Sequence, residues 1–143
     1  GLFGGPDGFV YAFDPTPVAD EDGYLILTER WRCDANKPEY RVLDGKRLKY
    51  ATRKGPSEVL STVISWEGRV FAVIGQDPEH GEGVGRLVCI DPSGSGDVSA
   101  SHVVWSYDGI HRSMSTPSIA DGFIYVADYS GFIYCLDAQT GCH

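Results

Sequence analysis

The sequence lacks both the long apolar runs that cross membranes as helices and the excess of basic residues that nucleic-acid-binding proteins carry. No apolar run approaches the roughly 18 residues that a membrane span needs. The 143 residues include 20 Asp or Glu and 12 Lys or Arg, so the net charge is −8. Because a nucleic-acid-binding surface needs clustered cations to replace released counterions, we expect no nucleic-acid partner.

One local excess of positive charge lies between residues 41 and 54. It comprises Lys46, Arg47, Lys49, Arg53 and Lys54. Runs of like charge usually form solvated surface, and we interpret this stretch as a solvated loop.

The chain is also poor in methionine, with a single residue, and has no Leu/Ala/Glu/Lys-rich stretch of the kind that forms helices. Eighteen glycines, eight prolines and 12% aromatic residues suit short strands joined by tight turns. The four cysteines, Cys33, Cys89, Cys135 and Cys142, lack the paired spacing of a metal site. We expect an all-β protein in which Cys89 and Cys135 are small core residues, and the sequence leaves disulfide formation open.

Internal repetition constrains the fold more than any other feature of the sequence. The matching segments are residues 61–73 with 115–127, residues 87–91 with 133–137, and residues 7–14 with 130–137. The offset falls from 54 in the first pair to 46 in the second, which indicates an insertion near residues 76–83. Repeats of this kind indicate several copies of one small structural unit.

Each copy is predicted to be a small antiparallel sheet. Asp121-Gly122 lies between two apolar stretches and predicts a hairpin, because a type I′ turn needs positive φ at both central residues. Strands around Trp31 and Trp105 supply a fourth strand to their copies, and we expect both tryptophans to be packing anchors.

The apolar pattern indicates how these sheets pack. Residues 123–127 and 132–136 are apolar on both alternating faces, whereas a sheet with one wet face would alternate polar and apolar residues. Four-stranded sheets covered on both faces by their neighbours are the blades of a β-propeller. A two-layer sandwich is the competing architecture, but it does not explain the repeat.

We therefore predict a fragment of an all-β propeller, with about two four-stranded antiparallel blades and part of a third. The expected single domain spans residues 1–143: the end of one blade in 1–15, a second blade with insertions in 24–97, and a truncated third blade in 103–143. Closed propellers need roughly four to eight blades. We expect the natural protein to be longer and its remaining blades to cover the open faces.

The segment from Thr116 to Gly141 resembles the repeat of the pyrroloquinoline-quinone-like propeller family. In that family a glycine-turn hairpin is followed by Ala-x-Asp-x-x-Thr-Gly, and here the corresponding residues are Cys135 to Gly141. The resemblance implies that this turn packs against the tryptophan of the next blade. The family includes quinone-dependent dehydrogenases, a periplasmic lipoprotein scaffold for outer-membrane protein assembly and many exported bacterial propellers. A periplasmic or secreted location is implied by this resemblance.

The insertion carries residues with the chemistry of a metal site. Asp77, Glu79, His80 and Glu82 fall close together, and oxygen-rich clusters hold calcium, while an imidazole suits zinc or another transition metal. A long hairpin loop whose charges keep its tip in water explains the same residues.

A second candidate site combines two connections. His111 and Arg112, in the segment after the Trp105 strand, have the chemistry to bind an anion or transfer a proton. Asp128 and Tyr129 lie in the neighbouring hairpin turn and are expected to line the same mouth of the propeller. Both pairs are also explained as ordinary turn residues. On the binding hypothesis, the four residues form a loop-face site for a protein partner or a small ligand.

Three functions fit these patterns. The favoured one is a non-catalytic scaffold or binding module, because the structural repeat is complete while no catalytic motif is found. The alternative is part of a quinone-dependent dehydrogenase, a quinoprotein oxidoreductase whose cofactor residues lie outside this chain. Pyrroloquinoline quinone and calcium are implied only by the family resemblance. A hydrolase or lyase that uses His111 and nearby carboxylates is the third.

Overall fold

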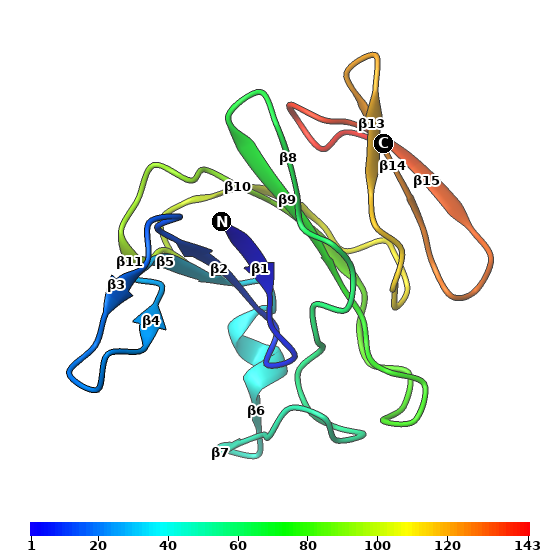
Figure 1. Cartoon of the computed structure of the whole chain (residues 1–143). Coiled ribbons are helices and arrows are strands. Elements are labelled where there is room, and N and C mark those ends of the chain that lie inside the picture. Colours follow the sequence, from blue (N-terminus) through cyan, green and yellow to red (C-terminus); the bar gives the residue numbers. More distant parts are fainter.

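The computed structural model describes residues 1–143 and consists of β-sheets, with no α-helix. Three sheets lie side by side along the chain and fan out like adjacent blades (Figure 1). No helix is long and apolar enough to cross a membrane. The all-β prediction is confirmed.

The three sheets follow one another along the chain, except that the last strand of the first sheet comes from within the second segment. The first sheet contains β1 (Leu2–Gly4), β2 (Phe9–Phe13), β5 (Glu29–Asp34) and β11 (Gly96–Asp97). The second contains β8 (Ile64–Trp66), β9 (Arg69–Ile74), β10 (Arg86–Ile90) and β12 (Val103–Tyr107), and the third contains β13 (Ser118–Ala120), β14 (Phe123–Ala127) and β15 (Ile133–Asp137). Two short hairpins, β3 (Val18–Ala19) with β4 (Leu25–Ile26) and β6 (Val42–Leu43) with β7 (Lys46–Arg47), and the 3₁₀-helix η1 (Pro38–Arg41) complete the chain.

Hairpin turns fix the register of the second and third sheets. Asp121 and Gly122 both have positive φ, at 50° and 80°, as a type I′ turn requires. Glu67 and Gly68 have φ of 45° and 72° at the equivalent turn between β8 and β9. The predicted hairpin at Asp121 is therefore confirmed, and the second sheet repeats it.

The second sheet is buried on both faces, as the sequence predicts for a blade. Alternate residues of β9 face opposite ways: Val70, Ala72 and Ile74 join a core shared with the first sheet, whereas Phe71 and Val73 join one shared with the third. Every residue of β9 from Val70 to Ile74 is almost inaccessible to solvent. Most of the apolar burial of the fold therefore lies in two interfaces between sheets.

The strand pairing divides the chain at points that differ from the expected blade bounds. The Trp105 strand, β12, pairs with β10 and completes the second sheet, so it does not open the third blade. After β10, the chain leaves the second sheet and then returns to it, so that β12 becomes the edge strand beside β10. That connection also sends β11 across to pair in parallel with β5, so the first sheet is not wholly antiparallel.

The turn after β15 packs on the preceding sheet, which corrects the direction implied by the family resemblance. Trp105 Nε1 donates a hydrogen bond of 3.2 Å to the Ala138 carbonyl, and a side chain at Gly141 would strike the indole ring. Asp137 Oδ1 accepts hydrogen bonds from the backbone of Gln139 and Thr140. These residues form a clasp between the third sheet and Trp105 of the second.

The outer face of the third sheet is open to solvent. Phe123, Tyr125 and Ile133 are 44%, 37% and 75% exposed, and Cys135 lies on the same face. Cys135 is exposed on this face, so these three sheets do not form the core position predicted for it. Cys89 is buried as expected in the core between the second and third sheets.

Candidate functional site

The loops at one end of the second and third sheets enclose a cavity of about 480 Å³, which we call the loop-face pocket. Three of the four predicted ligand-binding residues, His111, Arg112 and Tyr129, line it. They meet because the connection from β12 to β13 lies beside the turn between β14 and β15. The structure therefore brings these residues together as the sequence predicts, and their binding role remains a prediction.

Arg112 is the cation of this pocket. Its guanidinium lies over the ring of Tyr129, 4.4 Å from the ring centroid, and its Nη1 donates to the Gly81 carbonyl. No carboxylate forms an ion pair with it. Tyr129 is 56% exposed, so the pair presents an un-neutralised charge and an accessible aromatic surface at the pocket rim.

Asp128 lies beneath this rim and shapes the turn instead of facing the pocket. Its Oδ1 accepts hydrogen bonds from the backbone of Ser130 and Phe132, and its Oδ2 accepts from the Tyr134 hydroxyl at 2.9 Å. Oδ2 also accepts a longer bond of 3.4 Å from the His111 backbone. Both carboxylate oxygens of Asp128, the fourth predicted ligand-binding residue, are therefore occupied by hydrogen bonds within the chain. One of these bonds positions the His111 backbone.

The same hydrogen bonds make the turn sensitive to acid. Burial alone would raise the pKa of Asp128, but the bonds from Phe132, Tyr134, His111 and Ser130 outweigh it and hold the pKa below its ordinary value of 3.8. A carboxyl group with a depressed folded-state pKa contributes stability above the unfolded value and loses it as the pH falls through the folded value.

We therefore expect the free energy of unfolding to fall as the pH drops below about 3.8, and to fall less steeply in Asp128→Asn. Denaturant unfolding at a series of acidic pH values measures this slope. Asp121→Asn, at an exposed hairpin turn, is the control and should keep the wild-type slope. Parallel slopes for wild type and Asp128→Asn would contradict the assignment.

The predicted metal cluster does not form. No three histidine, cysteine or carboxylate groups gather anywhere in the chain. Asp77 Oδ1 instead accepts the Glu79 backbone N–H at 2.8 Å, and His80 Nδ1 lies 3.2 Å from the buried carboxylate of Glu58. Glu82 lines the loop-face pocket. Local turn bonds engage Asp77 and the pairing with Glu58 engages His80, so this structure does not gather the four side chains, and a metal-binding role for them remains a prediction.

The residues of this chain do not gather into a calcium site, which the family resemblance implies for the quinone-dependent enzymes. A calcium ion would need a group of oxygen ligands that the chain does not assemble. Burial raises the pKa of the Cys33 and Cys89 thiols to about 12 and about 11, which makes both unreactive, and all four cysteines are free. A quinone-dependent activity remains a prediction that would require residues outside this chain.

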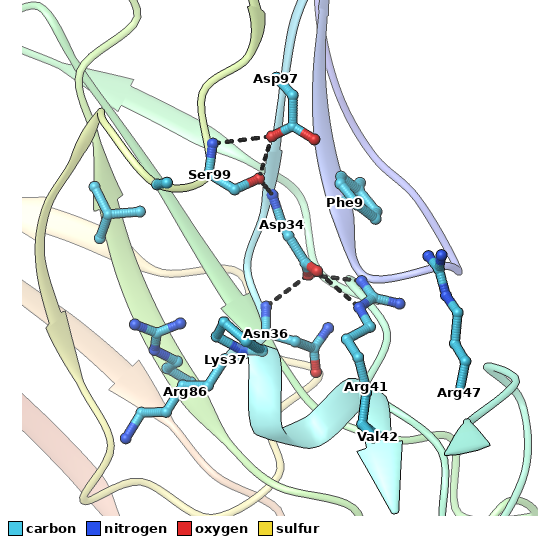
Figure 2. A pocket seen from close by; sticks show the side chains of 13 residues that line it. Phe9, Asp34, Asn36, Lys37, Arg41, Val42, Arg47, Arg86, Asp97 and Ser99 are labelled. Atoms are coloured by element: carbon cyan, nitrogen blue, oxygen red, sulfur yellow. Dashed lines mark hydrogen bonds and ion pairs between the residues drawn. The ribbon is translucent and has the colours of Figure 1, made fainter. Parts of the chain in front are cut away.

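A second cavity, of about 510 Å³, lies between the first two sheets and η1, and we call it the inter-blade pocket (Figure 2). Its lining includes Phe9, Asp34, Arg41, Arg47, Arg86 and Val103. Arg41 Nε and Nη2 donate to both carboxylate oxygens of Asp34 at 2.7 and 2.6 Å, and the guanidinium lies 4.9 Å from the centroid of the Phe9 ring. Sequence reasoning missed this pocket because its walls come from segments that only tertiary packing unites.

Two four-stranded sheets and one three-stranded sheet, packed face to face, define the chain as part of a β-propeller. No family model and no curated protein matches the sequence. Among solved structures, the chain is similar to BamB from Moraxella catarrhalis, with a TM-score of 0.66 and 11% identity. The match covers 99% of this chain and 32% of the BamB chain, so this chain spans about a third of that length. At this identity the likeness establishes the propeller fold alone, which is the predicted class.

Proposed function

We propose that this chain is part of a non-catalytic β-propeller scaffold that binds a protein or a small ligand through its loop face. The observation that carries the proposal is the pairing of Arg112 with Tyr129 at the loop-face pocket. Arginine and tyrosine are among the residues that most often dominate binding energy at interfaces. The BamB-like fold supports a role in interaction, since propellers commonly present their loops to partners.

Two further elements belong to this proposal. The open face of the third sheet would be covered by remaining blades of the same propeller, which its exposed apolar residues support. An exported location, periplasmic or secreted, is supported by the family resemblance of residues 116–141. The pyrroloquinoline-quinone-like repeat family is proposed on the same ground.

The proposal predicts that Arg112→Ala combined with Tyr129→Ala weakens capture of a partner by the full-length protein about tenfold or more. Quantitative pull-down followed by affinity measurement with the recovered partner tests it. Arg30→Ala is the matched control, because Arg30 is an exposed arginine that pairs with Asp14 at 3.7 Å and does not line the pocket. Equal capture by the double variant and the wild type would remove the loop face from the model.

A further inference from the structure

The positive charge of the chain is distributed unevenly once ion pairs are counted. Of the seven Lys and Arg residues outside residues 46–54, six form an ion pair with a carboxylate, and Arg112 is the exception. None of the five cations within residues 46–54 forms one. We call this segment the basic loop. A chain of net charge −8 thus concentrates un-neutralised positive charge in one place.

The basic loop borders a groove. The inter-blade pocket and a neighbouring hollow of about 830 Å³ share Phe9, Arg41 and Arg47, so the two are continuous past these residues. Lys49 and Tyr50 line the far end. Arg47 and Lys49 are exposed and make no side-chain hydrogen bond. The Arg47 guanidinium and the Lys49 ammonium group are therefore free to contact a ligand.

The middle of the groove is held rigidly. Asp34, which anchors Arg41, also accepts the Asn36 backbone N–H at 3.0 Å, and its own N–H donates to Ser99 Oγ at 2.8 Å. The Asp34–Arg41 pair is only 15% and 12% exposed, so it fixes the guanidinium against Phe9 (Figure 2). A preorganised wall of this kind lowers the ordering cost of binding.

We propose that this groove binds an extended acidic peptide of a protein partner. Carboxylates of the peptide would contact Arg47 and Lys49, and an apolar side chain would enter the inter-blade pocket between Phe9 and Val103. Charge complementarity selects an acidic ligand. The apolar side chains of Phe9 and Val103 beside the cations favour a peptide over a nucleic acid, whose continuous phosphate charge would meet Asp34 and Asp97 of the lining.

This inference goes beyond the loop-face proposal, because the groove and the loop-face pocket share no lining residue. The two can therefore fail separately. Loss of partner capture in the Arg112 and Tyr129 double variant tests one site, and the experiment below tests the other.

The probe is a fluorescein-labelled ten-residue peptide that alternates glutamate with leucine and phenylalanine, titrated with the protein and followed by fluorescence anisotropy. We expect the wild type to bind it, and Arg47→Glu combined with Lys49→Glu to weaken binding at least about tenfold. The same peptide with glutamine in place of glutamate should bind at least about tenfold more weakly to the wild type. Circular dichroism and thermal unfolding verify that the variant is folded.

Arg53→Glu combined with Lys54→Glu is the matched control. It makes the same change in net charge, but neither residue lines the groove, and the hollow that both line contains neither Arg47 nor Lys49. At 0.15 M salt, where charges beyond about 8 Å are screened, it should weaken binding less than about threefold. Equal loss in both double variants, equal binding of the glutamate and glutamine peptides, or tighter binding of a ten-nucleotide single-stranded DNA would each overturn the proposal.

Discussion

Replacing Phe71 with alanine should lower the free energy of unfolding by about 4 kcal/mol. Phe71 is fully buried in β9 and belongs to the core between the second and third sheets. Its ring lies 5.9 Å from that of Trp105, centroid to centroid, so truncation removes both apolar burial and an aromatic contact. The surrounding strands are fixed by their ladders and cannot close the cavity. Denaturant unfolding monitored by tryptophan fluorescence measures the loss.

Phe132→Ala is the control for this prediction. Phe132 is 61% exposed on the loop between β14 and β15, and its truncation should change stability by less than about 0.5 kcal/mol. A loss below about 1 kcal/mol for Phe71→Ala would mean that the two sheets do not share the tightly packed core described above.

Replacing Asp34 with alanine should cost about 3 kcal/mol, because it leaves the guanidinium of Arg41 buried without its counterion. The pair is bidentate and largely shielded from water, with side chains 15% and 12% exposed. The variant also loses an acceptor for the Asn36 backbone N–H.

Asp14→Ala provides the comparison, since Asp14 pairs with Arg30 at 3.7 Å on the surface, with side chains 41% and 66% exposed. Exposed pairs contribute little, so this variant should lose less than about 1 kcal/mol. If thermal and chemical unfolding give equal losses for the two variants, the Asp34–Arg41 pair is not the buried anchor of the groove.

The fold was largely predictable because its signals are local. Strands that are apolar on both faces, such as Phe123–Ala127, predict sheets pressed between sheets, and the second sheet shows this packing. The hairpin turn at Asp121 was predictable from the dipeptide Asp121-Gly122 alone. The sequence prediction wrongly placed strand β12 in the third blade, whereas it pairs with β10 of the second. The residues of Val103–Tyr107 predict a strand, but they do not show which sheet that strand joins.

Some residues of the candidate sites could be placed from the sequence, and others could not. His111, Arg112 and Tyr129 were predictable because propeller connections gather at one end of the sheets. The carboxylates near His80 were misleading, since spacing in sequence does not reveal that Asp77 is engaged in its own turn. The sequence showed the excess of positive charge around Arg47, but it did not show the groove, because Phe9, Arg47 and Arg86 are far apart in the chain and only tertiary packing brings them together.

The strand β11 has a consequence for how the chain opens. By pairing with β5 and bonding Val98 N to the Arg32 carbonyl at 2.9 Å, the loop of the second blade straps the first two blades together. The third blade is held mainly by the clasp on Trp105 and by one shared core. When residues 1–143 are studied alone, local opening should therefore start at the third blade, and amide hydrogens of β14 and β15 should exchange with solvent sooner than those of β9 and β10.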